Sequence, residues 1–178
     1  MSNVLLEMKD ITKTFPGVHA LDHFSFNLCA GEVHALVGEN GAGKSTLMKI
    51  LYGVYAPDEG EIFIEGQKVA IKSPSEALQL GIGEVFQELN VCMQMDVTNN
   101  IFIGNLKTKK HLVDDKTLRK EAEKILQDTV GLYVDPTLPV RSLSIAEQQM
   151  VEIAKVISRG GKVIVFDEPT CLLYTSDA

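Results

Sequence analysis

The 178-residue sequence is poor in cysteine, has fewer basic than acidic residues and lacks any long hydrophobic run. Cys29, Cys92 and Cys171 lie far apart, with no pair at metal-ligand spacing, so neither a metal nor a redox role is expected of them. The net charge of −7 argues against a broad electrostatic surface for nucleic acid. No apolar segment approaches the roughly 20 residues of a membrane span, and the N-terminus lacks the pattern of a signal peptide. We therefore expect a cytoplasmic chain with one core-forming domain.

One glycine-rich segment matches a phosphate-binding loop. Residues Gly38–Ser45 fit the P-loop pattern Gly-x-x-x-x-Gly-Lys-Ser/Thr. Glycines let backbone N–H groups close around phosphate oxygens, Lys44 can reach the β- and γ-phosphates, and the Ser45 hydroxyl can bind Mg²⁺. A glycine-rich turn with a chance lysine is the alternative. The residues expected to hold the phosphates are Gly38, Asn40, Gly41, Gly43, Lys44, Ser45 and Thr46.

The segments around this loop predict a strand before it and a helix after it. The apolar run 33–37 is typical of a buried strand, and 46–51 has a helical pattern whose N-terminus would point at the anion. Residues 4–30 alternate loosely between apolar and polar side chains, which predicts strands joined by a turn at Pro16–Gly17. We expect this first part of the chain to form a mixed β-layer around the P-loop.

Later segments carry helix signals. Ser73, followed by Pro74 and by Glu76, has the pattern of a capped helix start. Another helix is predicted at roughly 145–158, and the apolar run 163–166 that follows suits a central parallel strand. Between the helix that starts at Ser73 and this one, a further helix is predicted by four apolar residues on one face: Leu118, Ala122, Ile125 and Leu126.

Two carboxylates directly follow the last predicted strand. The segment Val163–Glu168 looks like a Walker B motif joined to a catalytic glutamate. In a doubly wound sheet the ligand sits at the carboxyl ends of the strands, so this strand would deliver Asp167 toward the Mg²⁺ shell and Glu168 toward the attacking water. A strand that ends in an acidic turn is the alternative.

The segment Leu143–Gln149 points to one family of P-loop proteins. It resembles the signature motif of ATP-binding cassette (ABC) proteins, usually Leu-Ser-Gly-Gly-Gln, and lies shortly before the Walker B strand as in that family. By this resemblance, Ser144 and a positive helix end contact ATP held by a second cassette. Ser144 and Glu147 also form a capping box. The two roles are compatible, because a hydroxyl can accept from a backbone N–H and still donate to a phosphate oxygen.

Two further positions match ABC cassettes by their order along the chain. Gln87 follows a short strand predicted at 83–86 and lies between the P-loop and the signature, as the Q-loop glutamine does. By resemblance it would contact Mg²⁺ or the attacking water and signal to the membrane partner. Phe15 resembles the A-loop aromatic that stacks on adenine, and an ordinary core residue at a strand end is the alternative.

The resemblance implies a fold for most of the chain. Residues 1–170 would form an α/β nucleotide-binding domain, with a P-loop NTPase core, a mixed or parallel sheet, an N-terminal antiparallel β layer and a helical signature subdomain at about 90–158. Three segments, 17–22, 31–40 and 148–155, look like the first cassette of carbohydrate importers of the ribose, galactose and xylose type.

The same resemblance implies an ATPase that energises sugar import with ATP and Mg²⁺. The implied partners are a second cassette, integral membrane permease subunits and, indirectly, a periplasmic sugar-binding protein, with no nucleic acid. The chain would sit peripherally on the inner face of the cell membrane. By the same resemblance, the catalytic residues would be Glu168, Lys44 and Gln87. The metal ligands would be Ser45, Gln87 and Asp167.

The end of the sequence departs from the family pattern. Residues 171–178 resemble a translated sequencing adaptor, and the four histidines all precede the Walker B segment, so none can serve as the switch histidine by chain order. We therefore expect a cassette that is incomplete at its C-terminus. Two other hypotheses stay open: a soluble ABC-type ATPase of translation or DNA repair, and a fragment that binds ATP without hydrolysing it.

Overall fold

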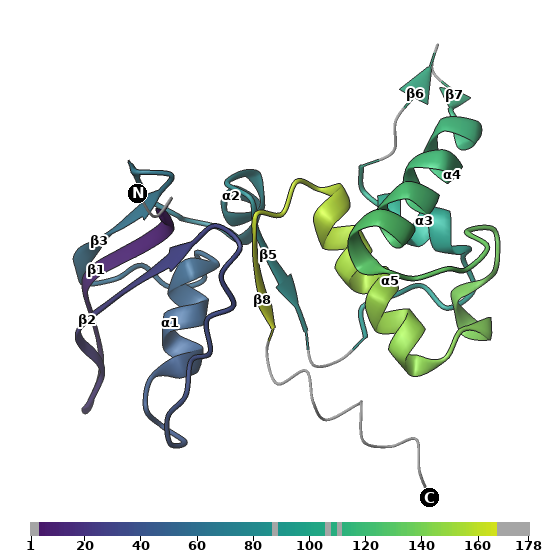
Figure 1. Cartoon of the computed structure of the whole chain (residues 1–178). Coiled ribbons are helices and arrows are strands. Elements are labelled where there is room, and N and C mark those ends of the chain that lie inside the picture. The colour runs from purple at the N-terminus through teal and green to yellow at the C-terminus, as the bar shows by residue number, and fades with distance from the viewer. Residues whose placement is uncertain (1–3, 87–88, 106–107, 110–111, 167–178) are drawn as a thin grey trace, which may run out of the picture. The chain divides into compact units, whose positions relative to one another are not determined.

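A computed structural model describes residues 4–86, 89–105, 108–109 and 112–166 (Figure 1). The chain divides into two compact units, with the boundary between Ile82 and Gly83. None of the helices in the described ranges combines the length and the apolar character that crossing a membrane requires.

The first unit is built on a four-stranded antiparallel sheet in the order β2-β1-β3-β4. The turn expected at Pro16–Gly17 joins β1 to β2, as predicted. Two helices complete the unit, and the first starts inside the glycine-rich segment. The elements are β1 (Val4–Phe15), β2 (Val18–Cys29), α1 (Lys44–Leu51), β3 (Glu59–Ile64), β4 (Gln67–Val69) and α2 (Pro74–Gln79).

The register of this sheet follows from its apolar side chains. Met8 at the centre of β1 lies opposite Phe26 of β2 and Ile62 of β3, and Met8 is fully buried. Leu47 and Ile50 of α1 are also buried, because they fall on one face of the helix. The apolar faces of the sheet and of α1 thus support the loop that precedes α1.

The prediction of a strand at residues 33–37 is wrong. The structure assigns no strand to this segment, and the side chains of Val33 and Val37 are 98% and 90% exposed. A buried parallel strand needs hydrogen-bonded neighbours. No described strand pairs with residues 33–37, so the apolar run has no ladder to join.

The second unit is mainly helical. The helices predicted near residues 118 and 145–158 are both present, as is the strand 163–166. A π-helical turn, η1, continues α4 and ends at Gly131, whose φ of +74° is left-handed. The elements are β5 (Ile82–Val85), α3 (Val97–Phe102), β6 (Thr108–Lys109), β7 (Leu112–Val113), α4 (Asp115–Lys124), η1 (Ile125–Val130), the 3₁₀ turn η2 (Val140–Ser142), α5 (Ile145–Ser158) and β8 (Val163–Phe166).

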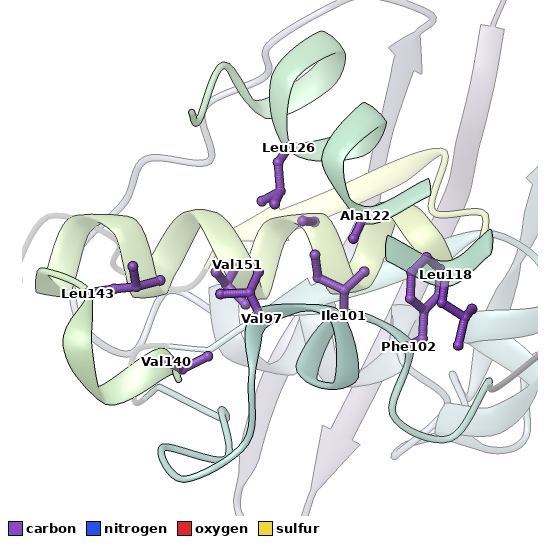
Figure 2. Packing of buried hydrophobic residues seen from close by; sticks show 10 residues of the cluster. Val97, Ile101, Phe102, Leu118, Ala122, Leu126, Val140, Leu143 and Val151 are labelled. Atoms are coloured by element: carbon purple, nitrogen blue, oxygen red, sulfur yellow. The ribbon is translucent and has the colours of Figure 1, made fainter. Parts of the chain in front are cut away.

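An apolar cluster holds α3, α4, η1 and α5 together (Figure 2). Leu118, Ala122 and Leu126 are each 0% exposed, which confirms the face predicted from their spacing, while Ile125 is only partly buried. Val97, Ile101 and Phe102 of α3 and Val151 of α5 complete the contact. The long helix α5 is therefore fixed along its length by burial of apolar surface.

Strands β5 and β8 pair with each other and run in the same direction (Figure 1). Val163 of β8 is buried, whereas Phe166 at its end is 45% exposed. Neighbouring parallel strands release the chain at one edge of their sheet. Val85 and Phe166, the last residues of the two strands, consequently lie at the same edge.

Candidate functional site

The start of α1 differs from the starts of the four other α-helices in the described ranges. Those helices begin at Ser73, Asp96, Asp114 and Ser144, and each of these side chains accepts a hydrogen bond from a backbone N–H of the first turn. The N-cap of α1 is Gly43, which has no side chain to offer. Because a helix leaves its first N–H groups without intrahelical acceptors, α1 presents donors and a positive dipole end to any anion.

Two glycines shape the loop that leads into α1. Gly41 and Gly43 have φ values of +89° and +88°, in the left-handed region that favours glycine. A Cβ atom at Gly43 would lie 2.3 Å from the carbonyl oxygen of Ala20 in β2, whereas none of the described atoms lies within 4 Å of a Cβ at Gly41. Gly43 thus lets the loop approach β2 closely.

Lys44 places a positive charge inside the loop. Its Nζ atom donates to the carbonyl oxygens of Gly38 and Glu39 at 2.6 and 2.9 Å, so the side chain folds back over the loop. Ser45 is exposed and Thr46 half-buried on the first turn of α1. An ammonium group, free N–H donors and hydroxyls form a donor set that suits phosphate oxygens. Gly38 and Asn40 are exposed on the same loop.

Phe15 stands at the end of β1 beside a second aromatic residue that the sequence did not indicate. Its ring meets that of Tyr55 edge-on, with centroids 5.2 Å apart. Lys13 Nζ lies 5.7 Å from the Phe15 centroid, and Lys49 Nζ lies 5.6 Å from that of Tyr55. Phe15 is only half-buried, so it is not a fully enclosed core residue.

The start of α5 forms the capping box that was predicted. The backbone N–H and the hydroxyl of Ser144 donate to Glu147 Oε2 at 2.7 and 2.8 Å, and Glu147 N–H donates to Ser144 Oγ at 3.4 Å. The hydrogen bond from the Ser144 backbone N–H, followed by the one from its hydroxyl, holds the pKa of Glu147 below its usual range. The Ser144 proton is therefore directed to Glu147 in this structure. A phosphate would have to compete for it.

Gln148 is a further residue of the signature segment with a structural role. Its side chain is buried, and Nε2 donates to the carbonyl oxygens of Leu143 and Val140 at 2.9 and 3.3 Å. It therefore ties the turn before α5 to the first turn of that helix. A buried amide needs hydrogen-bond partners of this kind. The position of Gln148 in the sequence gave no sign of this structural role.

Three predicted site residues, Gln87, Asp167 and Glu168, lie outside the described residues. The described chain brings only their neighbours together, since β5 ends at Val85 beside β8, which ends at Phe166. Within the described ranges, no group of three or more histidine, cysteine or acidic side chains could hold a metal ion.

Comparison with known proteins gives the chain a family. The model of the family described as ABC transporter matches residues 21–171. The chain is 48% identical over 99% of its length to the xylose import ATP-binding protein of Geobacillus kaustophilus. It is 49% identical over 97% to the galactose/methyl galactoside import ATP-binding protein of Clostridium perfringens, and 50% over 94% to the arabinose import ATP-binding protein of Yersinia pestis. It spans 35%, 33% and 32% of these proteins, about a third of their length.

Solved structures agree. The chain is 28% identical to CbiO1 from Clostridium perfringens, part of an ABC transporter complex, with a TM-score of 0.79 and coverage of 94% of this chain and 66% of that one. A dimeric ATP-binding cassette bound to ADP and Pi is 26% identical, with a TM-score of 0.70 and coverage of 96% and 77%. These matches confirm the expected α/β cassette fold with its antiparallel and parallel sheets. The chain belongs to the ABC transporter family.

Proposed function

We propose that this chain is an ATP-binding cassette that energises import of a sugar through a membrane permease. The observation that carries the proposal is the uncapped start of α1, where Gly43 leaves the helix donors free and Lys44 lies inside the loop. The relatives named as import ATP-binding proteins for xylose, galactose and arabinose support the substrate class. No feature of the chain favours translation or DNA repair.

The proposed nucleotide site combines residues of two cassettes. The loop Gly38–Thr46 holds the ATP phosphates, and the half-buried ring of Phe15, with Tyr55 beside it, provides a surface for adenine. By resemblance to the ABC signature motif, Ser144 and the start of α5 would face the ATP of a second cassette, and a relative described as a dimer bound to ADP and Pi supports a pair of cassettes.

The resemblance to ABC cassettes assigns the metal and the water to particular residues. Ser45, Asp167 and Gln87 would hold Mg²⁺, which when bound would neutralise charge on the transferring phosphoryl group. Glu168 polarises the attacking water, and Lys44 stabilises phosphate charge. With membrane permease subunits as partners, the chain would lie peripherally on the inner face of the membrane, and a periplasmic sugar-binding protein would deliver the sugar.

The decisive experiment uses a complete transporter that contains this cassette, reconstituted in lipid vesicles. Glu168→Gln should still bind ATP but lose nearly all hydrolysis and sugar uptake, because the residue acts on water rather than on nucleotide. Glu123→Gln, an exposed residue of α4, is the matched control and should leave turnover unchanged. Normal turnover in Glu168→Gln would refute the assignment.

The isolated 178-residue chain offers a second test. Because each site in the proposal takes its signature from another cassette, the chain alone should bind ATP with little turnover. Rapid hydrolysis by the isolated chain that disappears in Lys44→Ala would contradict a shared site.

A further inference from the structure

The end of β1, which carries Phe15, is held by one acidic residue from the loop between α1 and β3. The backbone N–H of Asp58 donates to the carbonyl oxygen of Thr12 at 2.9 Å. Its carboxylate accepts from Lys13 Nζ at 2.6 Å and from the backbone N–H of Thr14 at 2.7 Å. The three residues that lead into Phe15 are therefore all bound to a single residue that lies far away in the sequence.

These bonds extend beyond the last pair of the ladder between β1 and β3. That ladder ends at Thr12 and Glu59, whereas Asp58 reaches two positions further along β1, to Thr14. An exposed ion pair alone stabilises little, but the Lys13 side chain is only 15% exposed and the backbone bond to Thr14 accompanies it. The hydrogen bond from Lys13, followed by the one from Thr14, holds the pKa of Asp58 below its usual range.

Tyr55 connects the Phe15 ring to α1. The backbone N–H of Tyr55 donates to the carbonyl oxygen of Lys49, in the last turn of the helix, at 3.2 Å. Its ring meets that of Phe15 edge-on, and edge-on aromatic pairs have a preferred geometry. Because α1 begins at Lys44 of the phosphate-binding loop, one short helix links that loop to the ring pair.

We propose that Tyr55 and Asp58 are positioning residues that hold the Phe15 ring at a fixed place relative to the start of α1, so that the site favours a triphosphate that carries a base over a bare triphosphate. This role rests on the proposed function, in which Phe15 provides the surface for adenine. The base and the phosphates of a nucleotide are covalently joined. A ring that is already held at the matching distance therefore binds the base without a further ordering cost.

A purely structural role for the two residues predicts a different pattern of binding. If Tyr55 and Asp58 served only to stabilise the first unit, their loss would affect every ligand of the phosphate-binding loop alike. A positioning role removes only the part of the affinity that the base contributes. The ratio of the affinities for ATP and for inorganic triphosphate separates the two roles.

The test titrates the 178-residue chain with Mg²⁺ and either ATP or inorganic triphosphate in a calorimeter. Asp58→Ala and Tyr55→Ala should weaken ATP binding about five- to tenfold and leave the affinity for inorganic triphosphate within about twofold. Phe15→Ala should show the same selective loss, at least as large. Tyr55→Phe keeps the ring and should retain the affinity of the unaltered chain for both ligands.

Glu61→Ala is the matched control for Asp58→Ala. It removes an exposed carboxylate of the same sheet that pairs with Lys68, and it should change neither affinity. If the alanine chains do not fold, Asp58→Asn and Tyr55→Leu are milder variants, and a selective loss of ATP affinity of about twofold or more is expected of each.

Two results would overturn the positioning role while the proposed function stands. One is an unchanged affinity ratio in the Asp58 and Tyr55 variants when Phe15→Ala does weaken ATP binding. The other is an equal loss of affinity for both ligands, which indicates a structural role. Unchanged ATP affinity in Phe15→Ala would refute the adenine surface of the proposed function, and the positioning role with it. No ATP binding by the unaltered chain would refute the phosphate-binding loop itself.

Discussion

Gly43 is the position where the loop geometry can be tested most sharply, because Gly41 provides a matched control in the same loop. Both glycines have φ near +90°, so alanine strains the backbone at either position. Only at Gly43 would the new Cβ also meet another element, at 2.3 Å from Ala20 O and 2.9 Å from Leu21 Cδ2. The pair of variants therefore separates backbone strain from the close approach to β2.

The magnitudes follow from these contacts. A side chain in the left-handed region costs about 1–2 kcal/mol, and this is the whole effect expected for Gly41→Ala. In Gly43→Ala the backbone of β2 must move, because the contact atom is a carbonyl oxygen, which adds about 1–3 kcal/mol of overpacking. The loss of unfolded-state entropy on replacing glycine is the same for both and cancels in the comparison.

The assay is urea denaturation of the 178-residue chain, followed by hydrogen exchange on β1 and β2 so that the first unit is observed by itself. We expect Gly43→Ala to lower the free energy of unfolding by about 1–3 kcal/mol more than Gly41→Ala does. Equal destabilisation by the two variants would refute the claim that the loop rests on β2 through Gly43.

Three further predictions concern the second unit. Ser144→Ala should lower the free energy of unfolding by about 1 kcal/mol at neutral pH. Because the pKa of Glu147 is lowered in the folded chain, the stability from its carboxylate is present above the ordinary carboxyl pKa and is lost as the pH falls through the folded value. Urea melts should therefore show a smaller loss of unfolding free energy in acid than at neutral pH. Gly83→Ala would place a Cβ 2.1 Å from Val156 Cγ1 and should lower the free energy of unfolding by about 1–3 kcal/mol. The double variant that also carries Val156→Ala should regain part of this unfolding free energy, and no regain would argue against that contact. Leu118→Ala removes a fully buried side chain from the apolar cluster and should lower the free energy of unfolding by about 2–5 kcal/mol in the same melts, and a loss under 1 kcal/mol would contradict its burial.

Local signals in the sequence were sufficient for many elements. The helix starts at Ser73 and Ser144 were predictable because a hydroxyl cap and a glutamate three residues later satisfy orphan N–H groups within four residues of chain. The buried face of α4 was predictable because its apolar residues keep the helical period. The helix after the glycine-rich loop was predictable from the helical pattern of residues 46–51.

Features that depend on distant partners were not predictable. The segment 33–37 has the composition of a strand, but pairing is a property of its neighbours rather than of its own side chains. The contact of Gly43 with Ala20 and the pairing of Phe15 with Tyr55 join residues more than 20 positions apart. The burial of Glu152 in α5 was missed too. The one signal for its burial was that Glu152 lies four positions after Gln148, on the same face of α5.

The central claim is that the Gly38–Ser45 loop, with its uncapped helix and its lysine, binds the phosphates of ATP. Titration of the 178-residue chain with Mg²⁺ and ATP in a calorimeter tests it directly, with Lys44→Ala beside Lys72→Ala, an exposed lysine of the same unit. A hydrogen bond to a charged group contributes about 1.5–3 kcal/mol, so Lys44→Ala should weaken binding by about 10- to 150-fold while Lys72→Ala changes nothing. Equal affinity in all three proteins, or no binding to the unaltered chain, would contradict the account.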